Sequence, residues 1–235
     1  MFYEYEKDIG YIEVVGINTE EMPMWTINHY FKVLCDNYVK LILLEKLCTL
    51  AQQGLHSSNI AISRGSVPIM PKGKNIERFL YNNENIVEYV VKNEQPDKFW
   101  ELFKRCERPM IYRRELDNSW TPLYDYFSDE AIKICRVAYN SPIETGIKGI
   151  TSALIDLTTS NRRNRWEEEE HITRQIDNLA NSYGSIVRAT QIIEDERTPE
   201  GIKQYAREGL NYLMEKQRVM NERLDIRIRR IDRYV

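Results

Sequence analysis

Arginine residues gather at both ends of the last third of the chain, where they could bind an anion. This third carries 15 basic and 14 acidic residues, and all of the basic ones are arginine except Lys203 and Lys216. The planar guanidinium group forms paired hydrogen bonds with carboxylates and phosphates. Two interpretations stay open: ion pairs on a solvated helix, or a basic end that binds phosphate or nucleic acid. The candidate anion-binding residues are Arg162, Arg163, Arg165, Arg229 and Arg230.

Signatures of catalysis are weak elsewhere. The three histidines are far apart, and no cysteine lies at metal-ligand spacing from them, so we expect neither a zinc site nor a cofactor. Pro96-Asp97 resembles the start of a metal-dependent nuclease motif, with Glu88 as a second acid, but the acid-x-Lys element that should follow is missing. We therefore predict a protein that is not an enzyme, and keep a metal-dependent hydrolase as the less favoured alternative.

The composition points to a cytoplasmic protein. The four cysteines form no CxxC pair and read as reduced thiols, and no apolar run approaches the roughly 20 residues that a membrane-spanning helix needs. The net charge of −3 disfavours a general membrane or nucleic-acid binder. The abundance of Ile, Asn, Lys and Tyr suggests a bacterial genome rich in A and T. A membrane partner is not expected.

The strongest pattern is a pair of heptad segments. The first carries Ile172, Ile176, Leu179, Tyr183, Ile186, Thr190 and Ile193, and the second carries Ala206, Leu210, Leu213, Gln217, Met220 and Leu224. Apolar residues at alternating spacings of four and three form the seam of a coiled coil. Thr198-Pro199 separates the segments by a short turn. The sequence thus predicts an antiparallel coiled-coil hairpin over 161–235.

Polar residues within this seam favour a role in assembly. Tyr183, Thr190 and Gln217 weaken packing but specify register and partner. We expect an adaptor or regulatory subunit that assembles with a protein partner or with itself through the hairpin. The alternative is a module of a regulatory or defence system that responds to nucleic acid or nucleotide. The predicted partner-binding residues are Tyr183, Ile186, Thr190, Leu210, Leu213 and Gln217.

The remaining chain, 1–160, predicts a globular α+β domain. Gly10–Asn18 and Ala131–Tyr139 are rich in β-branched residues, which is typical of strands. Met24–Gln53 predicts a long helix with Gly54 as its C-cap. Shorter helices are expected over Pro96–Cys106 and Ile143–Leu157, and a further one over Asn75–Lys92.

Two stretches are less clear. Residues 54–75 carry three glycines and two prolines, so we expect a long loop with at most one short strand. Asp225–Val235 fits both a helix and a strand, and we favour a strand that returns to the sheet. The fold class predicted is α+β, predominantly α-helical, with a small mixed sheet and the C-terminal hairpin.

Overall fold

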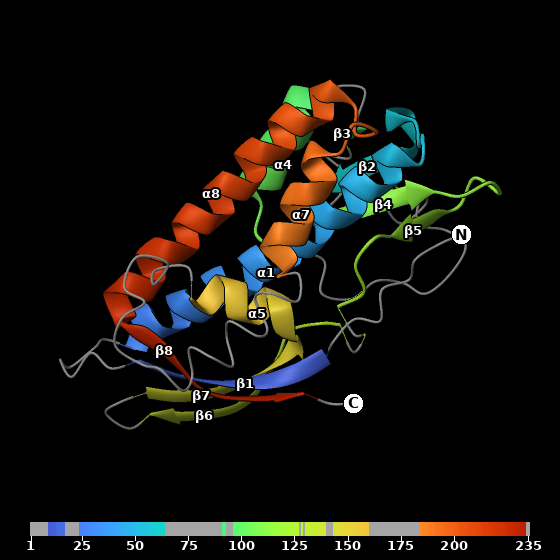
Figure 1. The fold of residues 1–235 in the computed structure, drawn as a ribbon. Coiled ribbons are helices and arrows are strands. Elements are labelled where there is room, and N and C mark those ends of the chain that lie inside the picture. Colours follow the sequence, from blue (N-terminus) through green and yellow to red (C-terminus); the bar gives the residue numbers. More distant parts are fainter. Residues whose placement is uncertain are drawn as a thin grey trace. The chain divides into compact units, whose positions relative to one another are not determined.

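The computed structural model describes residues 9–16, 24–63, 91–92, 96–126, 128, 130–139, 143–159 and 184–233. Within these residues lie five α-helices and two four-stranded sheets, both antiparallel (Figure 1). The α+β class is confirmed, whereas the prediction of a mixed sheet was wrong.

The chain divides into two compact units. Unit 1 combines Met1–Tyr38, Tyr126–Arg188 and Met214–Val235, and unit 2 combines Val39–Asp125 and Ala189–Leu213. Each unit therefore includes residues from both sides of the predicted domain boundary after residue 160. The predicted division into 1–160 and 161–235 stays a prediction.

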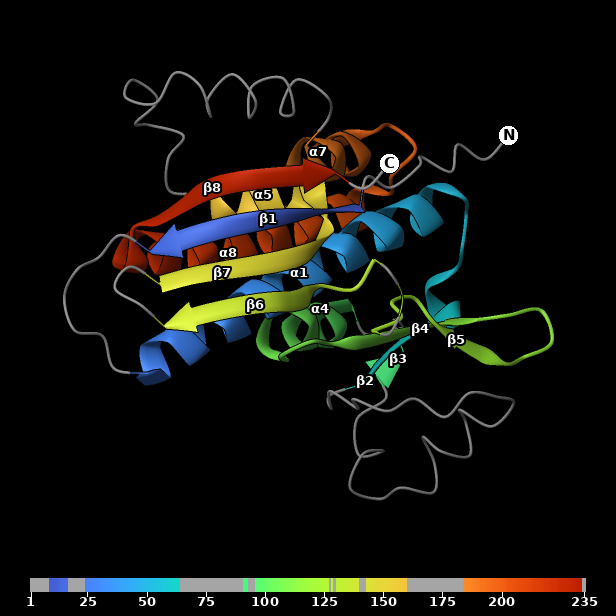
Figure 2. The ribbon, with the colours of Figure 1, turned by 90° about the horizontal axis from the view of Figure 1, so that it is seen from below.

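Unit 1 is built on the sheet β6-β7-β1-β8. β1 (Ile9–Gly16) lies between β7 (Ile143–Ile150) and β8 (Ile226–Arg233). One edge of the sheet is β8, and the other edge is β6 (Lys133–Tyr139). Alternate residues of β1, including Ile12 and Val14, are buried, as expected when one face of a sheet is covered. Helix α5 (Thr151–Thr158) packs across that face, behind the strands in Figure 2. The strands predicted near the N-terminus and at 131–139 are confirmed.

The helix predicted over Ile143–Leu157 was wrong in its first half. Ile143–Ile150 is the strand β7, and only the following residues are helical, as α5. Two glycines explain the difference. A Cβ on Gly146 would lie 2.1 Å from Tyr11 Oη, and one on Gly149 would lie 2.8 Å from Tyr38 Oη. Each glycine thus gives room to a tyrosine ring, a requirement that periodicity cannot reveal.

The C-terminal stretch forms the strand β8, as we favoured. Glu13 pairs with Arg230 and Val14 pairs with Ile228, so Arg229 is the extra residue of a β-bulge. The bulge places Ile231 opposite Ile12 even though Ile231 lies three positions, rather than two, after Ile228. This spacing is the reason that the sequence also fitted a helix.

Helix α1 (Met24–Gln52) agrees with the prediction to within one residue. It ends where Gly54 adopts φ +79°. The amides of Gly54 and Leu55 donate to the carbonyls of Ala51 and Leu50, a pair of bonds that defines the Schellman motif. α1 and the C-terminal helix α8 (Glu200–Leu224) each contribute residues to both units.

Unit 2 holds the second sheet, of order β3-β2-β4-β5. The helix predicted after Pro96 is confirmed as α4 (Pro96–Arg105), and it buries Phe99, Trp100 and Phe103. β4 and β5, which form a hairpin, were not predicted. The expected helix over Asn75–Lys92 lies outside the described residues except at its end, which is β3. The short elements are the 3-10 turn η1 (Ser57–Asn59), β2 (Ile60–Ser63), β3 (Val91–Lys92), β4 (Met110–Arg114) and β5 (Trp120–Pro122).

Candidate functional site: the two faces of helix α8

One face of α8 is buried along its whole length. The heptad positions that the sequence assigned to the seam are all at most 7% exposed. The pattern therefore identified the buried face of the helix correctly. These residues are Ala206, Leu210, Leu213, Gln217, Met220 and Leu224.

In unit 2, α8 packs against α1 and α4 through apolar contacts. A Cβ on Gly209 would lie 3.5 Å from both Leu44 and Phe103. Tyr205 stacks on Trp100 of α4, with 6.0 Å between ring centroids and 7° between planes. Its hydroxyl donates to the Asp97 carboxylate, and this hydrogen bond raises the pKa of Tyr205.

In unit 1, the buried contacts of α8 include polar groups beside the apolar Met220 and Leu224. Asn37 Nδ2 donates to Gln217 Oε1 (3.0 Å), Gln217 Nε2 donates to Asn221 Oδ1 (3.0 Å), and Asn221 Nδ2 donates to the carbonyl of Leu157 (2.6 Å). All three amide side chains are 0% exposed. We call Asn37, Gln217 and Asn221 the amide ladder. It joins α1, α8 and the last turn of α5.

Charged groups support the same register in unit 1. Lys216 Nζ lies 3.3 Å from the carboxylate of Asp36, which is buried. The guanidinium of Arg223 lies 5.4 Å from the centroid of the Trp25 ring. The heptad face of α8 thus packs on α1, α4 and α5 among the described residues. The predicted coiled-coil hairpin is not confirmed.

The part of the first heptad segment that the structure describes is helix α7 (Ser185–Glu194). Its buried apolar positions are Ile186, Ala189 and Ile193, whereas Thr190 is exposed. The amide of Ile186 donates to the Asp156 carboxylate of α5 (2.7 Å), which caps the start of α7.

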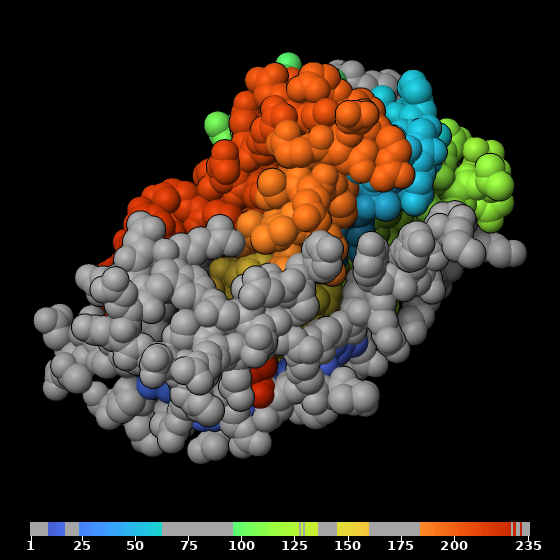
Figure 3. Space-filling model, viewed as in Figure 1, coloured from blue at the N-terminus to red at the C-terminus, as the bar shows by residue number. Residues whose placement is uncertain are grey.

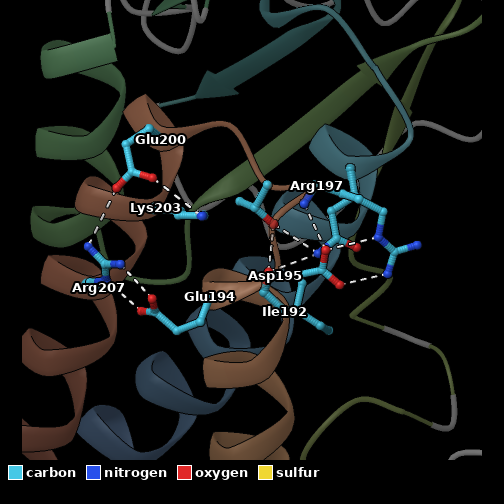
Figure 4. Close-up of polar contacts among 9 residues, drawn as sticks. Ile192, Glu194, Asp195, Arg197, Glu200, Lys203 and Arg207 are labelled. Atoms are coloured by element: carbon cyan, nitrogen blue, oxygen red, sulfur yellow. Dashed lines mark hydrogen bonds and ion pairs between the residues drawn. The ribbon is translucent and has the colours of Figure 1, made fainter.

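The turn from α7 to α8 is held by polar contacts (Figure 4). The hydroxyl of Thr198 donates to the carbonyl of Ile192 (2.6 Å), at the end of α7. Arg207 forms two hydrogen bonds of 2.5 Å with Glu194. Hydrogen bonds from Arg197 lower the pKa of Asp195 to about 2. These groups fix the turn.

The opposite face of α8 carries apolar and charged side chains at the surface. In unit 1, Val219 is 49% exposed, and near the start of α1 Met24 and Trp25 are each 60% exposed. Arg218 lies beside Val219 and binds both Glu215 (2.6 Å) and Glu222 (2.5 Å). The orange to red atoms of α8 form part of the molecular surface (Figure 3).

The heptad pattern did not reveal this outer face, because it follows the apolar positions on the buried face of the same helix. A signal was present in the repeat of acidic residues at 208, 215 and 222, seven residues apart, which marks a second face. Of the predicted partner-binding residues, Leu210, Leu213 and Gln217 are buried within the chain. Tyr183 lies outside the described residues.

The predicted anion-binding residues are only partly described. Arg162, Arg163 and Arg165 lie outside the described residues, as does Glu88 of the hydrolase hypothesis. Arg229 and Arg230 belong to the edge strand β8.

Within the described ranges, no three His, Cys, Asp or Glu residues are arranged to hold a metal ion. No helix in the same ranges has the length and hydropathy of a membrane span. No protein-family model matches the chain, and no curated protein or solved structure shows a significant similarity to it.

Proposed function

We propose that this protein is a non-catalytic adaptor or regulatory subunit that acts by binding a protein, either a partner or a second copy of itself. The observation that carries the proposal is the exposure of Trp25, Met24 and Val219 in unit 1. Aromatic residues, Met and Arg are enriched where proteins bind each other, and a Trp or Arg often dominates the binding energy.

The contact surface differs from the seam expected from the sequence. Leu210 and Leu213 are buried, so a partner reaches them only if the fold opens. Their role in assembly is therefore indirect, through holding α8 in position. The outer face of α8 and the adjacent start of α1 present the side chains that a partner can reach without any change in the fold.

A comparison of surface variants during purification tests the proposal. Tagged wild-type protein, a Trp25→Ser/Val219→Asp variant and a Val187→Asp variant are purified in parallel from the native cells. Val187 on α7 is 40% exposed, so it is a matched control for a polar substitution at an exposed valine. We expect a stoichiometric companion, or a doubled mass, with the wild type and the control only. Assembly that the double variant retains in full would contradict the proposal.

A nucleic-acid or nucleotide-responsive module remains the second candidate, favoured by the position of β8. Among the described strands, β8 pairs only with β1 and forms an edge of the sheet, and its sequence includes Arg227, Arg229, Arg230 and Arg233. An arginine-rich edge can meet phosphates, with an affinity that falls steeply as salt rises. Binding of an oligonucleotide that is lost in an Arg229→Glu/Arg230→Glu variant would support it, and binding independent of salt would exclude it.

A further inference from the structure

The sheet of unit 1 has a face that no described element of this unit covers. Helix α5 packs on one side of the strands, and the opposite side is turned towards the viewer in Figure 2. The side chains of β1 alternate between buried positions on the α5 side and half-buried positions on the opposite side, where Tyr11, Glu13 and Val15 lie. We call this opposite side the far face of the sheet. Its central strands are β1 and β7.

The ring of Tyr11 lies along the far face instead of standing out from it. The backbone of Tyr11 pairs with Lys148 of β7, yet the end of its side chain reaches Gly146, two residues away on that strand. A Cβ on Gly146 would lie 2.6 Å from Tyr11 Cζ. The end of the ring therefore occupies the space of a side chain at Gly146. Because Tyr11 is half-buried, part of the side chain remains in contact with solvent.

Two lysines lie in the same row as this tyrosine. Lys133 of β6 pairs directly with Lys148, which in turn pairs with Tyr11. Both lysines are half-buried. Like charges directly opposite each other on neighbouring strands destabilise a sheet, and an anion bound across the pair offsets this cost.

Basic residues outnumber acidic ones at the positions in register with the far face. The five basic residues are Lys133, Arg136, Lys148, Arg227 and Arg230, and the three acidic residues are Glu13, Glu144 and Asp232. This excess of two basic residues contrasts with the net charge of −3 for the whole chain. The far face is therefore a better place for an anion than the rest of the molecule.

We propose that the far face binds a single-stranded nucleic acid, with one base stacked on Tyr11 and neighbouring phosphates at Lys133 and Lys148. This inference goes beyond the adaptor function, and it rests on the second candidate function, to which it assigns a surface. Some four-stranded sheets bind single-stranded RNA by stacking bases on aromatic side chains. Such stacking accepts any base, because every base has a π-face, while basic groups beside the ring bind the phosphates.

Other occupants fit this face less well. The bases of a duplex are stacked on one another, so a base reaches Tyr11 only after it has been unstacked at a cost in free energy. The core of a protein–protein interface is depleted of charged residues, whereas Lys148 and Glu13 lie beside Tyr11 on the two central strands.

Fluorescence anisotropy tests the stacking. The probes are fluorescein-labelled oligouridylate and oligothymidylate of about 12 nucleotides, within the site sizes of small domains that bind single strands, and a duplex of the same length. We expect the wild type to bind one or both single strands more tightly than the duplex. Tyr11→Ser should weaken this binding at least about tenfold, because a stacked base is lost, whereas Tyr11→Phe should stay within about threefold of the wild type.

The matched control is Tyr212→Ser, which removes a tyrosine that is 45% exposed on α8. It should bind the single strands like the wild type, and circular dichroism confirms that each variant is folded. A folded Tyr11→Ser variant that binds like the wild type, or a wild type that prefers the duplex, overturns the proposal.

Salt dependence tests the lysines, and it decides the matter even if Tyr11→Ser does not fold. For single strands, the logarithm of the association constant falls against the logarithm of the salt concentration with a slope of about 0.7 per neutralised phosphate. Lys133→Gln/Lys148→Gln should therefore reduce the slope by about 1.4. Lys32→Gln/Lys98→Gln, which changes two exposed lysines on α1 and α4, should leave it unchanged. An unchanged slope in the far-face variant overturns the proposal.

The proposals can fail separately. A wild type that binds no oligonucleotide overturns this inference together with the second candidate function, and the adaptor function then stands or falls on its own test. Binding that is lost in Arg229→Glu/Arg230→Glu but unchanged in Tyr11→Ser keeps the second candidate function and overturns the far face as its site.

Discussion

The helices α1 and α8 contact each other differently in the two units. In unit 2 the contact is apolar: Leu44 of α1 approaches the backbone of α8 at Gly209, as does Phe103 of the neighbouring helix α4. In unit 1 the amide ladder and the Asp36–Lys216 pair add buried polar contacts beside the apolar Met220 and Leu224. Apolar burial stabilises a fold with little demand on geometry, whereas buried polar groups are costly unless their partners are correctly placed.

The difference indicates a division of roles between the two regions. A helix pair joined only by apolar side chains can slide by one turn at modest cost. The amide ladder forms hydrogen bonds in one register only, as a buried Asn does in a coiled coil. We therefore infer that the unit 2 contact provides most of the stability and that the unit 1 contact fixes the register. This register also sets which residues of α8 face outward, Val219 among them.

The largest expected effect is the removal of an aromatic ring from unit 2. Phe103 is 1% exposed and lies 5.4 Å, centroid to centroid, from Trp100. We expect Phe103→Ala to lower the free energy of unfolding by about 3–5 kcal/mol, because it removes apolar burial and leaves a cavity. Urea denaturation followed by circular dichroism measures the change. A loss below about 1 kcal/mol, the size typical of a surface site, would show that the unit 2 contact does not provide most of the stability.

A smaller loss is expected when the ladder is broken at one end. Asn37→Leu leaves Gln217 Oε1 without its donor, and an unsatisfied buried acceptor costs about 1–3 kcal/mol. The free energy of unfolding should fall by that amount in the same assay.

The matched variant replaces the whole ladder. Asn37→Leu/Gln217→Leu/Asn221→Leu leaves none of the three amides unpaired, although the Leu157 carbonyl loses its donor. We expect it to regain much of the stability, but with broadened NMR signals from more than one register. A triple variant with sharp signals and a single conformation would show that the ladder does not specify the register.

The apolar contact in unit 2 also predicts a response to alkaline pH. Burial raises the pKa of Cys48 on α1 from 9.0 to about 12. Because the folded pKa lies above the unfolded one, the stabilisation is complete below pH 9 and is lost as the pH rises towards 12. The slope is at most about 1.4 kcal/mol per pH unit for this thiol. Cys48→Ala should therefore flatten the fall in stability above pH 9, with the remaining slope due in part to Tyr112, whose pKa burial raises to about 12. An unchanged slope would show that Cys48 is accessible to water.

Much of this organisation could be predicted from the sequence, but not the choice of partners. The heptad spacing identified the buried face of α8 because a helix exposes or buries residues with a fixed period. It paired that face with the segment before it, whereas the structure pairs it with α1, whose apolar stripe lies about 180 residues away. Periodicity shows which residues are buried and carries no information on what buries them.

A residue's role could be predicted where it depends on its neighbours in the sequence, and not where it depends on distant residues. Gly54 could be recognised as a helix end because a Schellman motif needs a positive φ within a few residues. The role of Gly149 depends on Tyr38, which is distant in the sequence, so β7 was taken for a helix. The candidate assembly surface around Val219 was missed for a related reason. An exposed valine is notable only once the apolar heptad face of the same helix is known to be buried within the chain.

The smallest effect is expected at Gly209, where the apolar contact is closest. A Cβ there would lie 3.5 Å from Leu44 and Phe103, an ordinary van der Waals distance, and alanine favours a helix over glycine by about 1 kcal/mol. Gly209→Ala should therefore raise the free energy of unfolding by up to about 1 kcal/mol, measured by the shift of the urea midpoint.

Gly149→Ala in unit 1 is the contrasting substitution. Its Cβ would lie 2.8 Å from Tyr38 Oη, which is held by hydrogen bonds to Ile150 N and the Glu130 carbonyl. The tyrosine cannot yield without breaking these bonds, so this variant should lose stability. If both alanines destabilise the protein, the apolar contact is as demanding of geometry as the polar one, and the two regions do not differ in the way proposed.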